Sequence, residues 1–502
     1  MKKKFFIIGA LLIIGTVICI GLLISRQNRP ETVSLEMLYV NYYDSTDGLQ
    51  RIQERMNDLL TEKLNVSLNI TPVDSATYDD YLSGMLRRGQ TVDIVFLKDS
   101  IFPDLVKEGM LIDLSDLITD YGNDILQTFS GQYEFLMDTV AGYSQGGLYG
   151  VPSLDIKTSR NVVCMRKDLI EECGIDISGI HSYEDLDEVY QVIHEKRPDI
   201  TCLERSNQTF AINPMITFNG ITGYEGLGDG VGVLLEEGST RVVNLYESGQ
   251  YKDFVRKMHQ WYEKGYIEKD IATTSNRADI TYKTGNVFSY FTSTYMTTEG
   301  CAKDVVSWSG QDTVTVVLDD NGIPFTKFIT GIPVTSGDPA KALQVINEFY
   351  SNPELLNLFY YGEPKTDYHL DQEGLVKSEG ASGNKYYSNM NMITGNRLIA
   401  NVRDYEGRNY KQELEREVTI ENTTTAFGFV FDRTLIAEEY AQVKEIISEY
   451  APGLEFGVLD PETTLPVFQQ ELRDAGIDRI LTEKQKQLDR WLQEKDKKTL
   501  EP

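Results

Sequence analysis

Histidine is scarce in this sequence, with four among 502 residues. No two of them stand four residues apart, and no HExxH pattern or Cys/His cluster occurs, so a catalytic zinc site has no support. The G-x-S-x-G turn of serine hydrolases and the G-x-x-x-x-G-K-[ST] phosphate loop are also missing. The glycine-rich segment 223–232 contains no lysine and is expected to be a surface loop. We therefore expect no catalysis, no cofactor and no metal ion.

Cysteine is also rare, and four of the five cysteines lie outside the N-terminal apolar run, at 164, 173, 202 and 301. Their spacing matches no metal or redox signature. A chain of this length can build a sufficient hydrophobic core, so it does not need the disulfides that small secreted domains use. We expect four separate, mostly buried thiols.

Positive charge is in deficit, with 48 lysines and arginines against 77 acidic residues and a formal net charge of -29. Such a surface repels phosphate backbones and anionic lipid headgroups. We therefore expect no nucleic-acid binding. The composition suits a soluble ectodomain.

The N-terminus carries an uninterrupted apolar run from Phe5 to Ile24. About 20 such residues suffice to cross a bilayer as a helix. Lys2, which opens a basic stretch of three lysines, is expected to stay on the cytoplasmic side, so the rest of the chain faces outward. The run has no small-x-small exit, which favours an uncleaved membrane-spanning anchor over a cleaved signal. Cys19 follows the bulky Ile18, so we favour a buried thiol over a lipid attachment point.

A β-α-β-α-β pattern follows the anchor, with strands expected at 34–40, 66–71 and 92–97 and helical spacing between them. Alternation of this kind predicts a mostly parallel sheet with helices on both faces. Ligands of such sheets bind at the carboxyl ends of the strands. The loops after the first and third strands are therefore the first candidates for a binding site.

A second α/β pattern begins after residue 150, which predicts two lobes. Within it, Ser182 and Asp185 form a capping box for a helix over 187–195, and Asn321-Gly322 suits a hairpin turn. From about residue 431 the chain turns helical. The expected division is an anchor at 1–30, a first lobe at 31–150 with 277–334 returning to it, a second lobe at 151–276 with 335–425 returning to it, and a helical C-terminal domain at 426–502.

Several segments in this order, "VDIVF", "LYGVPS", "VVCMRKDLIEECGID", "WYEKGYIEKD" and "GIPVTSGDPAKALQVINEFYSNPELLNLFYYG", together with "AGIDRILTEKQKQLDRW", resemble extracellular solute-binding proteins of ABC importers. The resemblance is to the carbohydrate-type group (family 1) that has an extra C-terminal domain of unassigned function, and it runs from Leu35 to Trp491. It implies a two-lobed, periplasmic-binding-protein-like (type II) α/β fold with the ligand trapped between the lobes. The chain departs from the family at Ile18-Cys19, where most members are lipoproteins, and at 360–370.

Aromatic residues are plentiful, with 29 tyrosines and 20 phenylalanines. Sugar rings pack their C–H faces on aromatic rings, and tyrosine adds a hydroxyl group for hydrogen bonding. Trp261 is expected in the core because its helical phase matches that of Phe254 and Met258. The candidate ligand-binding residues, chosen because they stand at expected strand ends or in irregular segments, are Tyr42, Tyr43, Asp44, Asp99, Ser153, Asp155, Tyr224, Tyr290, Tyr295 and Trp308.

These observations predict a membrane-tethered, extracytoplasmic solute-binding protein. It would capture a small solute, an oligosaccharide or alternatively a peptide, by hinge closure and deliver it to the permease subunits of an ABC transporter. The chain is expected to act as a monomer. Two other classes stay open: a surface glycoside hydrolase, because abundant acidic residues make chance carboxylate pairs certain, and a surface sensor or adhesin ectodomain.

Overall fold

The computed structural model describes most of the chain beyond the N-terminal run. The described residues are 31–42, 46–98, 101–143, 147–154, 158–205, 225–227, 229–236, 238–272, 278–294, 296–324, 328–378, 385–388, 390, 393–419 and 423–500. The expected anchor at 1–30 lies outside these ranges. Among the described helices, none has the length and apolar character needed to cross a bilayer.

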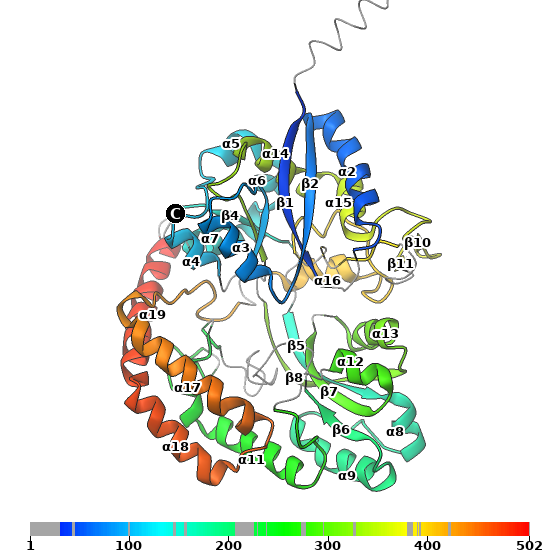
Figure 1. Ribbon diagram of the computed structural model, residues 1–502, viewed down its shortest axis with the longest axis vertical. Helices are drawn as coiled ribbons and strands as arrows, with labels where there is room; N and C mark the ends of the chain where they lie inside the picture. The colour runs from blue at the N-terminus through cyan, green and yellow to red at the C-terminus, as the bar shows by residue number, and fades with distance from the viewer. Residues whose placement is uncertain are drawn as a thin grey trace, which may run out of the picture.

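Two separate hydrophobic cores divide the molecule into two lobes (Figure 1). The first core draws its buried residues from 35–154 and 328–418, and the second from 163–318 and 426–488. The chain therefore passes from one lobe to the other three times, between residues 154 and 158, between 324 and 328, and between 419 and 423.

The sheet of the first lobe contains the expected β-α-β-α-β unit. Its strands are β1 (Val33–Asn41), β2 (Val66–Asp74), β3 (Val95–Lys98), β4 (Gly150–Pro152) and β9 (Phe328–Gly331). Strand β1 pairs in parallel with β2 and bridges to Ile94, just ahead of β3. Strand β9 lies antiparallel between β3 and β4. Four consecutive buried residues in the middle of β1 are covered on both faces, as a sheet between helix layers requires.

Helices cover this sheet because each buries one apolar stripe. Helix α2 buries Leu49, Ile52, Met56 and Leu60, which recur at helical spacing. Asp338 caps α14 ahead of a proline, as the sequence suggests. The helical and hairpin elements of this lobe are α2 (Leu49–Leu64), α3 (Tyr78–Arg87), α4 (Phe102–Lys107), α5 (Leu117–Tyr121), α6 (Asn123–Thr128), α7 (Glu134–Tyr143), α14 (Pro339–Ser351), α15 (Pro353–Tyr361), α16 (Tyr410–Glu417), β10 (Tyr368–Leu370) and β11 (Val376–Ser378).

The second lobe is built on a four-stranded sheet of order β6-β7-β5-β8. The strands are β5 (Thr158–Arg166), β6 (Thr201–Glu204), β7 (Val287–Thr294) and β8 (Thr313–Pro324). The predicted hairpin at Asn321-Gly322 is wrong, because β8 continues through these residues and pairs with β5 as far as Pro324. Pairing with a long neighbouring strand outweighs the local turn preference.

This pairing also corrects the expected lobe boundaries. Strands β7 and β8 belong to the second lobe, so 278–324 does not return to the first lobe as predicted. Residues 328–418 instead complete the first core. Both lobes alternate strands and helices, so the local pattern does not reveal which lobe a segment joins; non-local strand pairing decides it.

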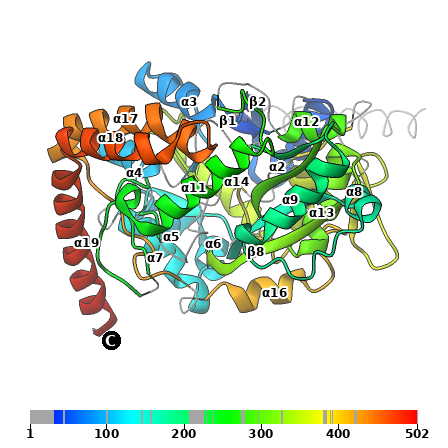
Figure 2. The same ribbon diagram turned by 90° about the horizontal axis from the view of Figure 1, so that it is seen from below.

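Helices α11, α12 and α13 and the C-terminal helices complete the lower part of the molecule (Figures 1 and 2). The capping box of Ser182 and Asp185 is present, one short turn ahead of α9. Helices α17 and α18 pack on α11, so the C-terminal helices share the second core. The helices are α8 (Lys167–Cys173), α9 (Leu186–Lys196), α11 (Gly249–Glu263), α12 (Ala278–Thr284), α13 (Thr298–Ser309), α17 (Ala437–Glu455), α18 (Pro461–Asp474) and α19 (Ile477–Leu500).

Arg397 and Glu406 form a buried ion pair in the first lobe. The guanidinium group of Arg397 donates two hydrogen bonds of 2.7 Å to the carboxylate of Glu406, and both side chains are almost fully buried. The rings of Tyr360 and Tyr410 lie 5.7 and 4.8 Å from the same guanidinium group. Removing one member of such a pair leaves an uncompensated buried charge.

We expect Arg397→Met to lower the free energy of unfolding by about 3–5 kcal/mol, since it removes the guanidinium partner of a buried carboxyl group. The double variant with Glu406→Gln should recover much of this loss. Urea denaturation followed by circular dichroism measures both. Arg473→Gln is the control, because it breaks an exposed ion pair with Glu247 and should cost less than about 1 kcal/mol. A cost that small for Arg397→Met would contradict the prediction.

Candidate functional site

The carboxyl ends of the first-lobe strands face the second lobe. Strands β1, β2, β3 and β4 all run in the same direction, because β9 is antiparallel to both β3 and β4. The chain leaves β4 at Pro152 and begins β5 of the other lobe at Thr158, so this edge adjoins the second lobe. Strands β6 and β7 likewise end toward the side where β5 begins. Each lobe thus presents the edge at which α/β sheets bind ligands.

Tyr42, Asp79 and Lys98 gather at the first-lobe edge. Tyr42 follows β1 and is half-buried; burial and the nearby charge of Asp79 raise the pKa of its hydroxyl group. Lys98 ends β3 and donates a 2.9 Å hydrogen bond to Oδ2 of Asp79. The other oxygen of Asp79, Oδ1, is buried and has no hydrogen-bond partner among the described residues. This edge therefore offers an aromatic ring, a cation and a free acceptor.

Ser153 and Asn161 flank the first crossing between the lobes. Ser153 follows β4, and Asn161 lies in β5, where the pairing with β8 shifts register. Both residues are buried, and Oγ of Ser153 and Oδ1 of Asn161 find no partner in the described part of the chain. Buried polar atoms are nearly always hydrogen-bonded, so these two atoms at the same crossing are candidate contacts for a ligand.

Glu204 is a buried carboxyl group at the last residue of β6. It accepts hydrogen bonds from the backbone N–H of Arg205 and, at 3.1 Å, from the hydroxyl of Thr281. Burial raises the pKa of Glu204 despite these bonds. Burial of an ionisable group costs stability, and Glu204 lies at the carboxyl end of a strand. Glu204 is therefore a candidate for a functional site.

The lobes also touch where α13 meets residues 403–405. A Cβ atom on Gly300 would lie 2.2 Å from the carbonyl oxygen of Tyr405, so only glycine fits there. On the same helix, Asp304 has its pKa raised to about 6, mainly by burial, with Glu406 adding to the shift and Arg403 opposing it. The guanidinium group of Arg403 lies 5.7 Å from the ring of Tyr405.

Six of the ten predicted site residues lie outside the described residues. They are Tyr43, Asp44, Asp99, Asp155, Tyr224 and Tyr295. Of the four others, Tyr42 and Ser153 lie at the first-lobe edge that faces the second lobe.

The structure places Tyr290 and Trp308 in a packed cluster of the second lobe. Tyr290 is 3% exposed, and its ring lies 5.2 Å from that of Tyr282. Trp308 is partly buried and lies 6.4 Å from the same ring. It stands near the end of α13, about 12 Å along the helix from Gly300. Tyr290 is thus packed inside the second lobe, and the role of Trp308 in ligand binding stays a prediction.

Sequence reasoning did not single out Asp79, Asn161, Glu204, Asp304 or Arg403. Glu204 did carry a signal, because it is a charged residue at the end of a short strand, whereas Asn161 follows three other polar residues at the start of β5. Asp304 and Arg403 carried none, since only the tertiary fold brings α13 and the 403–405 segment together.

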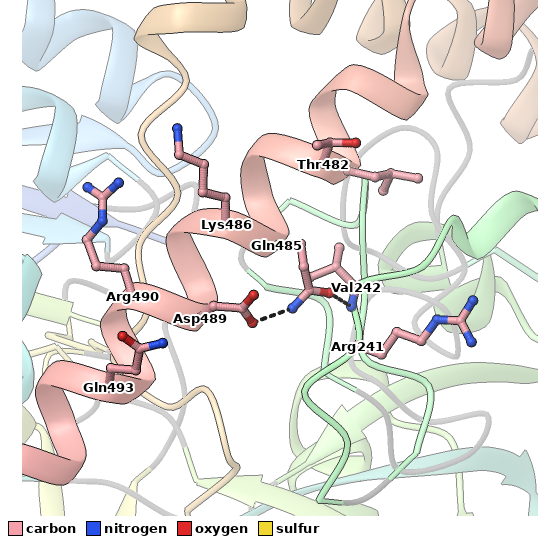
Figure 3. Close-up of a pocket in the computed structure, with 9 residues that line it drawn as sticks. Arg241, Val242, Thr482, Gln485, Lys486, Asp489, Arg490 and Gln493 are labelled. Carbon is pink, nitrogen blue, oxygen red and sulfur yellow. Dashed lines mark hydrogen bonds between the residues drawn. The ribbon is translucent and has the colours of Figure 1, made fainter.

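A surface hollow outside these edges lies between α19 and the segment around Val242 (Figure 3). Gln485 spans it, accepting a 2.7 Å hydrogen bond from the backbone N–H of Val242 and donating one to Asp489. Lys486 and Arg490 point away from Arg241 in Figure 3. The basic side chains do not point toward a common ligand position. We therefore interpret this hollow as part of the packing contact between α19 and the second lobe.

The two-lobed α/β architecture is that of solute-binding proteins. The structure resembles the N-glycan transport solute binding protein (NgtS) from Streptococcus pneumoniae with a TM-score of 0.75 and 23% identity, over 92% of this chain and 100% of that one. A family model described as bacterial extracellular solute-binding protein matches residues 55–362. Since that is more than half of the chain, the chain belongs to this family, as its sequence resemblance indicates. A domain of unknown function (DUF3502) matches residues 425–493.

Two curated relatives agree with this assignment. A carbohydrate ABC transporter substrate-binding protein from Streptococcus pneumoniae is 28% identical over 475 residues, covering 90% of each chain. The polygalacturonan/rhamnogalacturonan-binding protein YtcQ from Bacillus subtilis is 27% identical over 252 residues, covering 48% of this chain and 46% of its own.

We expect Glu204→Gln to stabilise the protein at neutral pH, because burial penalises the ionised carboxyl group. The folded state holds this proton to a higher pH than the unfolded chain does. The wild-type protein should therefore lose stability relative to the variant as the pH rises from about 4 to about 7. Thermal unfolding midpoints at both pH values measure the difference. The exposed substitution Glu188→Gln is the control, and a difference for Glu204→Gln that does not change with pH would refute the prediction.

Proposed function

We propose that this chain is a membrane-tethered, extracytoplasmic solute-binding protein that captures an oligosaccharide between its lobes and delivers it to the permease of an ABC importer. The observation that carries the proposal is the match to a carbohydrate ABC transporter substrate-binding protein along 90% of both chains. The two facing polar edges support it, because a solute held there contacts both lobes.

The unsatisfied atoms at these edges suit sugar hydroxyl groups. Oδ1 of Asp79, Oγ of Ser153 and Oδ1 of Asn161 are all oxygen atoms that accept hydrogen bonds. A sugar hydroxyl can donate to any of them, and the ring of Tyr42 offers an apolar surface for the C–H face of a sugar ring. Tyr43, Asp44, Asp99, Asp155 and Tyr295 directly follow these strand ends in the sequence, and with Tyr224 they belong to the proposed site.

Capture would proceed by closure of the lobes about the crossing segments. A solute that contacts both edges binds the closed arrangement more tightly than an open one, and this difference shifts the population toward closure. The chain's residues supply hydrogen bonds and packing in this mechanism, and no bond of the solute is made or broken.

We expect Ser153→Ala to weaken oligosaccharide binding by about 2- to 10-fold without lowering stability, because it removes one hydrogen bond to the solute and relieves an unpaired buried hydroxyl. Isothermal titration calorimetry measures affinity, and thermal unfolding measures stability. The matched control is Ser289→Ala, since the Ser289 hydroxyl is buried but donates a 2.6 Å hydrogen bond to the carbonyl of Cys202. The control should lose stability and keep its affinity.

The solute for this test comes from a thermal-shift screen of mannose-containing N-glycan fragments, pectin fragments and peptides. A ligand that prefers the native state raises the unfolding temperature. The proposal fails if no oligosaccharide shifts unfolding, or if the oligosaccharide is recovered cleaved.

The tether has its own test. If the backbone of residues 5–24 anchors the protein, Cys19→Ser should leave it in the membrane fraction of cells that express the full chain. Immunoblotting of membrane and medium fractions measures the distribution. Release of the variant into the medium would show that an acyl chain on Cys19 holds the protein instead.

A further inference from the structure

Residues 426–434, hereafter the strap, connect the two lobes at the start of the C-terminal domain. Ala426, Phe429 and Phe431 are buried in the second core. Phe427 lies between them in sequence but packs against the first core, with its ring 6.1 Å from that of Phe135 on α7. Adjacent strap residues are therefore held by different lobes.

Two ion pairs join the strap to α4 of the first lobe. Nζ of Lys107 lies 2.6 Å from Oδ1 of Asp432, and a guanidinium nitrogen of Arg433 lies 2.5 Å from Oδ2 of Asp104. Lys107 also donates a hydrogen bond to the hydroxyl of Thr434. Helix α4 and the strap each contribute one acidic and one basic side chain. Only one alignment of the strap along the helix therefore satisfies both ion pairs.

The strap is fixed firmly to the second lobe. The Arg433 guanidinium group lies 5.1 Å from the ring of Tyr440, whose hydroxyl donates a 3.0 Å hydrogen bond to Asp229. Asp229 pairs at 2.5 Å with Lys484, whose side chain is fully buried. A continuous series of polar contacts thus runs from the surface of α4 into the core beneath α19.

We propose that the strap is an interlobe latch through which the C-terminal domain holds the two lobes in one relative orientation. Its role in the protein rests on the proposed function: by stabilising one orientation, the latch sets how readily the solute-binding site opens. The start of β5 and the end of β8, where two of the crossings attach to the second lobe, are adjacent, because Thr158 pairs with Pro324. The strap is a separate point of attachment, and Figure 1 shows it at the left, near α4.

The latch is weak enough to be reversible. All four charged side chains are at least one-third exposed, and each such pair changes a two-state equilibrium by up to about fivefold. Loss of both pairs should raise the population of separated lobes by about 2- to 20-fold. Hydrogen bonds from Lys107 and Thr434 outweigh burial and lower the pKa of Asp432 to about 2, so the pair is charged at neutral pH.

The test measures the distance between the lobes in the full chain without solute. Spin labels on noncanonical amino acids replace the exposed residues Glu62 on α2 and Glu188 on α9, and double electron–electron resonance gives the distance distribution. We expect Asp104→Asn with Lys107→Gln to broaden the distribution or add a longer distance. These substitutions leave the strap and its packing on Tyr440 untouched.

A charge-conserving variant and a control make the test specific. Replacements that keep both charges on α4, Asp104→Glu with Lys107→Arg, should retain the narrow distribution and leave the strap unchanged. Arg473→Gln breaks an exposed ion pair within the second lobe and should change nothing. The latch is refuted if the Asp104/Lys107 variant matches the wild type or if the control broadens the distribution equally. No solute is present, so a failure to bind oligosaccharides cannot be mistaken for failure of the latch.

Discussion

The division of the apolar residues into two cores joined by three crossings constrains everything else in this molecule. Ser153 and Asn161 are eight positions apart in the sequence, yet one adjoins the first core and the other lies in the sheet of the second. A short connection between two sheets necessarily brings the ends of their strands together. The backbone groups of both residues pair, but Oγ of Ser153 and Oδ1 of Asn161 have no partner among the described residues, so an external hydrogen-bonding group can complete them.

Polar groups at this junction cost stability, and that cost supports a functional reading. The Ser153 hydroxyl, which has no partner among the described residues, and the buried carboxyl of Glu204 are both less favourable than apolar side chains of similar size would be. Two buried charges elsewhere in the described chain are held in ion pairs, Arg397 with Glu406 and Lys484 with Asp229.

Local sequence signals predicted local structure well. The capping box at Ser182 and Asp185 and the capped prolines after Asp338 and Asn352 are present because a cap depends only on residues within one turn. The α/β class and the two lobes also followed from alternation of strand and helix patterns.

Predictions that depended on distant pairing were less successful. The exchange of segments 278–324 and 328–418 between lobes reflects strand pairing across more than a hundred residues, which periodicity does not encode. Tyr290 shows the same limit, because its strand position could be inferred but not the helix α12 whose Tyr282 covers its ring. Asn161 reaches the junction in a strand whose first four residues are all polar, so its residue type did not distinguish it.

The C-terminal helices extend this reasoning to the domain boundary. The match to a separate domain covers 425–493, but Phe468 and Leu488 are buried in the same core as Trp261 of α11. Lys484 reaches Asp229, a residue of the second lobe, and is fully buried there. A segment that contributes core residues and a buried ion pair to its neighbour is physically part of that lobe. Its contacts with α4 therefore act between lobes, and any rotation that opens the junction must either carry the strap with it or break its ion pairs.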